Sequence, residues 1–299
     1  MILVFGKNGQ LGRELADAAA ERGCSLVAVS RNEADIAELS AVQRILERYR
    51  PDLVVNAAAY TDVDRAETDV AEANRTNAEG PRILARACRG RQIPLIHIST
   101  DYVFDGQNRE AYRETDAVCP LGAYGRSKAA GEAALMSETD HYAIIRTSWL
   151  FGKYGRNFLK TMLALAQKRD EISVVNDQHG GPTSARSLAA AIFQIAPLLV
   201  SDPAKSGIFH FAGHPYTTWH EFAHFIMSVQ SATTGRQPRV TAISSAEYAA
   251  PAPRPENSRL DCTKIERTFG ISGRSWRTEM VEITGEILSS EPVHENDPS

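Results

Sequence analysis

A glycine-rich loop near the N-terminus constrains the fold of this chain more than any other feature. A short apolar run at residues 2–5 leads into Gly6-Lys-Asn-Gly9-Gln-Leu-Gly12, and an Ala/Leu-rich helical pattern extends from Gln10 to Arg22. Strand, glycine loop and helix in this order are the context that a dinucleotide-binding fingerprint requires. The glycines let the backbone approach a pyrophosphate, whose charge is attracted by the free N–H groups and dipole of the helix start. A tight turn without a ligand is the alternative interpretation.

Strand-like and helical patterns alternate through the first half of the chain. The apolar runs that favour strands lie at residues 2–5, 25–29, 53–56, 94–98 and 143–146. This alternation predicts a doubly wound parallel sheet with right-handed crossovers. We therefore predict an α/β fold with a Rossmann-type NAD(P)-binding domain over residues 1–147.

The composition of the sequence changes after residue 147. Loops rich in aromatic, Asn, Gly and Pro residues alternate there with helical stretches at 158–168 and 184–199. Loops above the ends of strands are common substrate walls. Residues 148–288 are predicted to form mainly a smaller substrate-binding lobe, with some segments, such as a strand at 208–211, returning to the Rossmann domain. A polar tail is expected over residues 289–299.

The residues after the second predicted strand bear on the choice of cofactor. NAD-selective sites usually place a carboxylate there, whereas NADP sites use a cation for the extra phosphate. This chain has Ser30-Arg31, which favours NADPH, although Arg31 could equally be an exposed loop residue. Asp35 and Ile36 follow in the same loop and are candidates to flank the adenine.

A Tyr-x-x-x-Lys motif supplies candidate catalytic groups. Tyr124 and Lys128 are four residues apart, so on a helix they share one face. A neighbouring cation is expected to lower the pKa of a phenol and so make it useful in proton transfer. Ser99 and Thr100 end a predicted strand, where a hydroxyl could hydrogen-bond the oxygen that Tyr124 serves. The alternative is that both hydroxyls satisfy backbone groups in a turn.

Charge, cysteines and apolar segments exclude several classes of protein. The formal charge of −4 makes nucleic acid or an anionic membrane surface an unexpected partner. The four cysteines are far apart and form no Cys-x-x-Cys motif, which is typical of reduced thiols in a cytoplasmic protein. The first apolar run is too short for a signal peptide, and no segment is long enough to span a membrane.

His220-Glu221-Phe222-Ala223-His224 matches the His-Glu-x-x-His pattern of zinc proteases. An apolar face begins at Phe222 and recurs with helical spacing, which places both histidines on the opposite side, toward water. Thr218 and Glu221 also form a capping-box pattern, which gives the glutamate a structural role. We therefore predict no metal at this motif.

Several motifs taken together resemble one family. They are the glycine loop, Asn56-Ala-Ala-Ala59, Ser99-Thr-Asp-Tyr-Val-Phe104, Tyr124-x-x-x-Lys128, Arg146-Thr-Ser-Trp149 and Arg254-Pro-x-Asn-Ser-Arg-Leu260. Over residues 1–285 the chain resembles the dTDP-4-dehydrorhamnose reductases, extended short-chain dehydrogenases/reductases of nucleotide-sugar and polysaccharide biosynthesis. That family reduces the 4-keto group of dTDP-4-dehydro-β-L-rhamnose with NADPH or NADH.

The resemblance implies roles for individual residues. Tyr124 would donate the proton, Lys128 would be its electrostatic and ribose-binding partner, and Thr100 would hydrogen-bond the keto oxygen. With the motifs above, the expected cofactor-binding residues are Gly6, Gly9, Gln10, Leu11, Gly12, Ser30, Arg31, Asp35, Ile36, Ala59, Tyr60, Thr61, Tyr124 and Lys128. The expected substrate-binding residues are Thr100, Asp101, Trp149, Asn157, Arg254 and Asn257. Arg254 and Arg259 could clamp an anion.

The expected cofactor is NADPH, with NADH possible, and the expected partner is a dTDP-sugar. Some relatives dimerise around Mg²⁺ held by carboxylates, but the helix that begins at Ser184 starts without an acid. The resemblance therefore does not carry that metal to this chain, which could be a monomer or a homodimer. Two other functions stay open, a nucleotide-sugar epimerase or dehydratase and a non-catalytic NADP-binding regulatory subunit.

Overall fold

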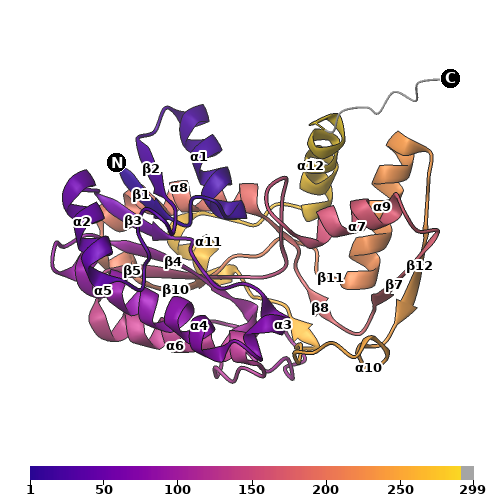
Figure 1. The fold of residues 1–299 in the computed structure, drawn as a ribbon, viewed down its shortest axis with the longest axis horizontal. Coiled ribbons are helices and arrows are strands. Elements are labelled where there is room, and N and C mark those ends of the chain that lie inside the picture. The colour runs from indigo at the N-terminus through magenta and orange to yellow at the C-terminus, as the bar shows by residue number, and fades with distance from the viewer. Residues whose placement is uncertain (291–299) are drawn as a thin grey trace.

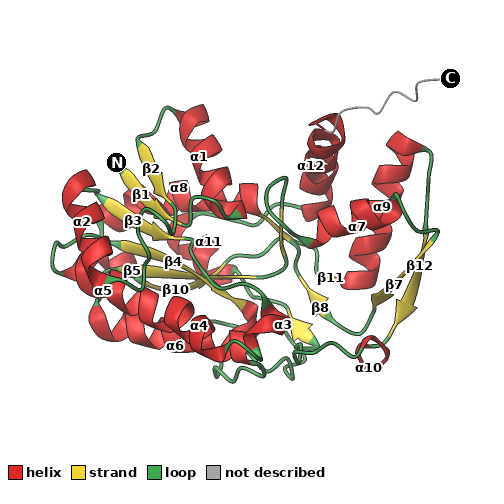
Figure 2. Ribbon diagram, viewed as in Figure 1, coloured by secondary structure: helices red, strands yellow, loops and turns green. Residues whose placement is uncertain are grey.

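Six parallel strands form the central sheet of the protein, seen in a computed structural model that describes residues 1–290 (Figures 1 and 2). Their order in space is β10-β5-β4-β3-β1-β2. The strands are β1 (Ile2–Phe5), β2 (Leu26–Val29), β3 (Leu53–Asn56), β4 (Leu95–Thr100), β5 (Tyr142–Thr147) and β10 (Gly207–His210). The predicted doubly wound α/β fold is confirmed. The strand order reverses between β1 and β3, which is where open α/β sheets bind ligands.

Helices cover both faces of this sheet and bury two separate apolar layers. One face packs against α1 (Gln10–Arg22), α8 (Ala185–Ser201) and α11 (Thr263–Phe269). The other face packs against α2 (Leu39–Tyr49), α5 (Gly80–Arg89) and α6 (Ala123–Glu138). Because strands buried on both sides need apolar residues throughout, β3 and β5 read as nearly continuous apolar runs.

The region between β3 and β4 is less regular than a single helix. It contains α3 (Val63–Ala66), α4 (Val70–Asn74), a π-helical turn at Arg75–Glu79 and then α5. Pro81 has no N–H to donate to the carbonyl four residues earlier, at Asn77, which favours the wider turn. The freed Asn77 carbonyl lies so close to Gly131 of α6 that a side chain at Gly131 would collide with it. The turn therefore brings Asn77 against the helix that carries Tyr124 and Lys128.

The remaining elements form a second apolar core beside the sheet. Here α7 (Phe158–Ala166), α9 (Trp219–Thr234) and α12 (Trp276–Ser290) pack together with the strand pair β7 (Glu171–Val175) and β12 (Arg239–Ile243). The short elements are β6 (Leu150–Phe151), β8 (His179–Gly180), β9 (Thr183–Ser184), β11 (Thr217–Thr218), β13 (Asn257–Ser258), α10 (Ser245–Tyr248) and two 3₁₀ turns, Asp101–Val103 and Pro203–Lys205. We call the region of α7, α9, α12, β7 and β12 the lobe; it lies to the right of the sheet in Figure 1.

The second half of the chain serves both the sheet and the lobe. After building part of the lobe, the chain returns to the sheet as α8 and β10, and later again as α11. Residues 291–299, most of the expected polar tail, lie outside the described part. Within residues 1–290, no helix combines the length and the apolar character needed to cross a bilayer.

Candidate active site

The glycine loop folds tightly over the turn that follows β3. Gly6 has a φ of 102°, and a Cβ there would lie 2.7 Å from the backbone of Ala57. A Cβ on Gly12 would collide with the carbonyl oxygen of Gly6. Helix α1 begins after Gly9 with no side-chain cap and no acid in its first turn. Its first N–H groups and the positive end of its dipole are therefore available to an anion.

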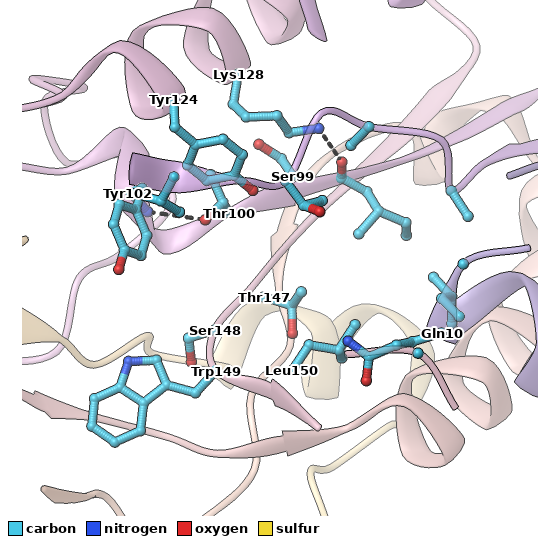
Figure 3. A pocket seen from close by; sticks show the side chains of 18 of the residues that line it. Gln10, Ser99, Thr100, Tyr102, Tyr124, Lys128, Thr147, Ser148, Trp149 and Leu150 are labelled. Carbon is cyan, nitrogen blue, oxygen red and sulfur yellow. Dashed lines mark hydrogen bonds between the residues drawn. The ribbon is translucent and has the colours of Figure 1, made fainter. Parts of the chain in front are cut away.

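A cavity of about 530 Å³ opens between this loop, the carboxyl ends of β3, β4 and β5, and the lobe. Figure 3 shows Tyr124 and Lys128 on one side and Thr147 to Leu150 on the other. The predicted site residues that line this cavity are Gly9, Gln10, Leu11, Ala59, Thr61, Thr100, Asp101, Tyr124, Lys128 and Trp149. Residues more than 100 positions apart in the sequence thus meet at one concave surface, as ligand sites of α/β sheets do.

Tyr124 stands in the first turn of α6 and is half-buried. Its ring meets Tyr102 edge-on, with 5.6 Å between the ring centroids. Burial raises the pKa of the Tyr124 phenol to about 12 and outweighs hydrogen bonding from Thr100, which lowers it. The prediction that Lys128 lowers this pKa is wrong for the protein without ligands. The phenol is instead fully protonated near neutral pH, which suits a proton donor.

Lys128 lies one helical turn further on and is 2% exposed. Its Nζ donates to the carbonyl oxygen of Ile98 at 2.6 Å and lies 3.4 Å from Nε2 of His97. Burial lowers the pKa of Lys128 to about 8, against the charge of Glu132, which raises it. The ammonium is thus held by the backbone of β4, which explains why its charge does not govern the neighbouring phenol.

Thr100 and Asp101 end β4 at the cavity wall. The Thr100 hydroxyl donates to Asp101 Oδ1 at 3.0 Å and accepts from the Tyr102 N–H at 3.2 Å. Burial raises the pKa of Asp101 to about 6. Among residues 1–290, no group meets the geometry of a hydrogen bond to the buried Asp101 Oδ2, although the Ser258 hydroxyl is near enough to lower the pKa of this carboxyl. A buried acceptor without a partner is costly, so this atom is a candidate ligand contact.

Thr147 is a cavity residue that the sequence did not single out as a site. It ends β5 directly beside Thr100 of β4 and is 7% exposed. Its hydroxyl oxygen has no hydrogen-bond partner among the described residues. Thr147 belongs to the Arg146-Thr-Ser-Trp149 motif, which could have marked it as a site residue. Only the register of β5 against β4 shows that its hydroxyl lies opposite Thr100.

Asn77 is a second residue that the sequence did not identify as part of the site. Its carboxamide accepts from the Tyr60 N–H at 2.8 Å, donates to the Tyr60 carbonyl at 3.0 Å and donates to the Ser127 hydroxyl at 3.0 Å. It therefore ties the turn after β3, which lines the cavity, to α6. The sequence around Asn77 carries no pattern that predicts the π-helical turn at Arg75–Glu79, which brings Asn77 inward.

A second hollow of about 260 Å³ continues from the glycine loop toward the end of β2. Its walls include the predicted residues Gly6, Gly9, Ser30, Arg31, Asp35, Ile36, Ala59 and Tyr60. Arg31 is exposed and donates to Glu72 at 2.7 Å and to Asp35 at 3.2 Å. The Ser30 hydroxyl donates to Glu33. Arg31 thus stands beside the hollow, already paired with two carboxylates.

Trp149 forms the lobe side of the main cavity. Its backbone has a φ of 49°, which is uncommon for a large residue, and its ring stacks on Trp219 with 3.7 Å between centroids. A side chain on Gly180 would lie 2.5 Å from the Trp149 ring. The indole is thereby held in one orientation against the lobe.

Two of the predicted substrate residues have structural roles outside the cavity walls. Asn157 caps α7 and also donates to the Gly152 carbonyl and to Gln10. Asn257 donates to the Asn108 and Glu110 carbonyls, both at 2.7 Å. Both carboxamides are occupied by these contacts, so neither is offered to a ligand.

The predicted clamp of two arginines does not form. Arg254 bonds Asp64 at 3.0 Å and lines a further cavity, of about 680 Å³, in the lobe. Arg259 instead donates to Asn257 Oδ1 at 2.8 Å and lies over the Tyr216 ring. The two guanidinium groups therefore lie at different places in the structure.

The His-Glu-x-x-His segment starts α9. The Thr218 hydroxyl accepts from the Glu221 N–H, as predicted, but the Glu221 carboxylate accepts from the Thr217 hydroxyl rather than completing a capping box. His220 lies 3.3 Å from the Val240 carbonyl, and His224 is exposed. Within residues 1–290, no three His, Cys, Asp or Glu side chains are grouped as a metal site requires.

The residues at the start of α8 do not fit the Mg²⁺ site of some relatives. Arg186 stands there, and its guanidinium donates to both carboxylate oxygens of Glu286 at 2.7 Å and lies 3.9 Å from Glu14. A guanidinium between two carboxylates neutralises the charge that a divalent cation would need.

Comparisons with known proteins agree on one family. The model of the RmlD substrate binding domain matches residues 1–288. The chain belongs to the dTDP-4-dehydrorhamnose reductase family. A dTDP-4-dehydrorhamnose reductase of Sinorhizobium fredii is 44% identical over 96% of this chain and 97% of its own length.

Solved structures of this family superpose closely on the chain. A dTDP-4-dehydrorhamnose reductase of Clostridium acetobutylicum, 35% identical, covers 96% of this chain and 99% of its own with a TM-score of 0.90. One from Bacillus anthracis in complex with NADP, 34% identical, covers 95% and 98% with a TM-score of 0.88. The family predicted from the motifs is therefore confirmed.

Proposed function

We propose that this protein reduces the 4-keto group of dTDP-4-dehydro-β-L-rhamnose to dTDP-L-rhamnose with NADPH, and also with NADH. The observation that carries this proposal is the cavity in which Tyr124, Lys128 and Thr100 converge beside an uncapped helix start. A binding module has no need of a protonated phenol held within its cavity. Family membership agrees with this reaction.

The residues of the glycine loop fit a dinucleotide. Only glycine can occupy Gly6 and Gly12 at these separations, and the resulting loop leaves the first N–H groups of α1 open to a pyrophosphate. The hollow near Ser30 and Arg31 would hold the adenosine half, and Lys128 would contact the nicotinamide ribose. When bound, the cofactor supplies the hydride that reaches C4 of the sugar.

The chain's own residues stabilise the negative charge that forms on the sugar and donate the proton. Negative charge grows on the C4 oxygen as the carbonyl is reduced, and the Tyr124 hydroxyl stabilises it. The Thr100 hydroxyl adds a second hydrogen bond when it turns from Asp101 Oδ1 to the substrate. Tyr124 donates its proton to that oxygen, since burial keeps the phenol protonated. Asp101 and Thr147 would hydrogen-bond the sugar through their unpartnered oxygens, and Trp149 would cover it.

The lobe cavity is the place we assign to the dTDP part of the substrate. It shares Tyr102 with the main cavity, so a ligand can extend from one into the other. Arg169 and Arg254 provide positive charge for a diphosphate, and Phe158 and Trp219 provide flat apolar surface for a base. A nucleotide sugar would thus span both cavities.

One assay separates the three candidate functions. The protein is mixed with NADPH and dTDP-4-dehydro-L-rhamnose, and the loss of NADPH absorbance is compared with the sugar product. Equal amounts of oxidised cofactor and reduced sugar are expected. Binding without turnover would favour the regulatory subunit, and sugar conversion without net loss of NADPH would favour the epimerase or dehydratase.

A further inference from the structure

A line of hydrogen-bonding side chains leads from β3 through β4 to Lys128 beneath the cavity. Asn56 Oδ1 accepts from the Ala58 N–H at 3.1 Å, and Asn56 Nδ2 lies 3.0 Å from Nδ1 of His97. Nε2 of His97 lies 3.4 Å from Nζ of Lys128. Asn56 and His97 are direct partners in the sheet, and both are 0% exposed. Their hydrogen bonds must therefore be satisfied by each other.

The backbone end of this line fixes the direction of every hydrogen bond in it. The Ala58 N–H can only donate, so the carbonyl oxygen of the Asn56 side chain must face it and the NH₂ group must face His97. That NH₂ group also only donates, so Nδ1 of His97 is the acceptor. A neutral imidazole then carries its proton on Nε2, which faces Lys128. Burial, followed by the nearby Lys128, keeps the pKa of His97 well below its usual range, so the ring is neutral.

This direction has a consequence for Lys128. An ammonium group has three donors and no acceptor, so a His97 N–H directed at it brings two donors together. A neutral amine has a lone pair and can accept that N–H. We propose that His97 is a positioning residue whose Nε2–H stabilises the neutral amine of Lys128, so that Lys128 readily supplies the proton that Tyr124 must regain after each reduction. This inference rests on the function proposed above.

The proton balance closes with the chain's own groups and solvent. In each turnover the O–H bond of Tyr124 breaks as its proton goes to the keto oxygen, which leaves a phenolate. An N–H bond of the Lys128 ammonium then breaks, its proton passes through solvent in the cavity that both residues line and re-forms the phenol, and the lone pair left on Nζ accepts from His97. Solvent returns a proton to Lys128, and no electrons move in these steps.

Three titratable groups face Lys128. His97 approaches from β4, Tyr124 stands one turn earlier on α6, and Glu132 stands one turn later. Glu132 favours the ammonium, but its carboxylate is held by Arg146 through hydrogen bonds of 2.9 and 2.6 Å. The His97 N–H therefore disfavours the ammonium form of Lys128, whereas the opposite effect of Glu132 is reduced by its pairing with Arg146.

Nitrogen NMR of the ligand-free protein labelled with ¹⁵N-histidine tests the direction of the line. The His97 signals are assigned by their loss in His97→Leu. We expect Nε2 of His97 to carry the proton and Nδ1 to carry none across the pH range of activity. A proton on Nδ1 would overturn the proposal. This readout needs no substrate, so it stands apart from the proposed reaction.

Two variants test the effect on Lys128, whose titration is followed by ¹³C-lysine NMR. In Asn56→Asp the new carboxylate accepts from both Ala58 and His97, which moves the imidazole proton to Nδ1 and turns Nε2 into an acceptor. We expect the pKa of Lys128 to rise by roughly one unit, a tenfold change in proton affinity, and the high-pH limb of kcat to move with it. Unchanged titration would overturn the proposal.

His97→Leu separates this effect from added charge. If the His97 N–H opposes the ammonium, its removal raises the pKa of Lys128. If His97 only fills space, more apolar surroundings lower that pKa further, and this result would contradict the proposal. Failure of the wild-type protein to reduce the dTDP-sugar, with both NMR results as expected, would remove the proposed function and leave the hydrogen-bond direction intact.

Discussion

Two regions of the main cavity differ in how their polar groups are satisfied. Around α6, Lys128 is bonded to the Ile98 carbonyl and Asn77 makes three hydrogen bonds. At the carboxyl ends of β4 and β5, Asp101 Oδ2 and Thr147 Oγ1 have no hydrogen-bond partner among the described residues. The contrast indicates that the region around α6 is organised by the protein alone, whereas the ends of β4 and β5 present oxygens that a ligand can hydrogen-bond.

The strongest test of this comparison is removal of the proton donor. We expect Tyr124→Phe to lower kcat by roughly a thousandfold, because general acid catalysis contributes on the order of 10² to 10⁴. NADPH binding, measured by fluorescence titration, should change by less than about threefold, since the phenol acts mainly in the transition state. Near-normal turnover would show that the role given to Tyr124 is wrong.

A variant at the carboxyl end of β5 should affect the sugar and spare the cofactor. In Thr147→Val the shape is kept and the unpartnered hydroxyl is lost. We expect kcat/KM for the dTDP-sugar to fall about tenfold, the value of one hydrogen bond of roughly 1.4 kcal/mol. Thr284→Val is a matched control, because that buried hydroxyl already bonds Met280 Sδ on α12 and lines neither cavity. Equal effects of the two variants on sugar kinetics would remove the contrast drawn above.

Asp101 should link the carboxyl end of β4 to the pH dependence of stability. Its pKa is raised to about 6, so the folded protein binds this proton more tightly than the unfolded chain, and stability is lost as pH rises from about 4 to 6. Asp101→Asn, which cannot ionise, should flatten this pH dependence and raise Tm at pH 7 by a few degrees, on the order expected for 1 to 2 kcal/mol. Thermal melts at pH 5 and 7 measure both, and equal pH slopes for the two proteins would contradict the burial argument.

The smallest effect is expected at the adenosine end. Arg31 is exposed and already bonded to Glu72 and Asp35, so only part of its charge is available to a 2′-phosphate. We expect Arg31→Ala to raise KM for NADPH about threefold to tenfold and to leave KM for NADH within about twofold. Steady-state kinetics with both cofactors decide this, and an equal change in the two KM values would remove the role of Arg31 in selecting NADPH.

Local patterns in the sequence were enough to predict the glycine loop, the strand ends and the Tyr124–Lys128 pair on α6. The glycine loop, the strand ends and the i, i+4 spacing of Tyr124 and Lys128 all depend on contacts close in sequence. Local reasoning failed where burial or pairing decided the outcome. The raised pKa of Tyr124, the inward turn at Asn77 and the placing of Thr147 opposite Thr100 follow from long-range packing, which no local pattern contains.

Asn157 and Asn257 likewise have contacts that no local pattern predicts. Both residues lie in motifs typical of a substrate wall, and a sequence cannot show that a side chain is already bonded to distant backbone carbonyls. The lobe is assembled from segments far apart in the chain, so its contacts were the least predictable.

The central claim is that hydride reaches C4 of the sugar while Tyr124 protonates the oxygen on the same carbon. Turnover with NADPH that carries deuterium at the transferable position, followed by NMR of the sugar product, tests it directly. We predict one deuterium at C4 of dTDP-L-rhamnose in the wild-type protein and almost no labelled product in Tyr124→Phe. Product that lacks deuterium at C4, or labelled product formed equally well by the variant, would contradict this account.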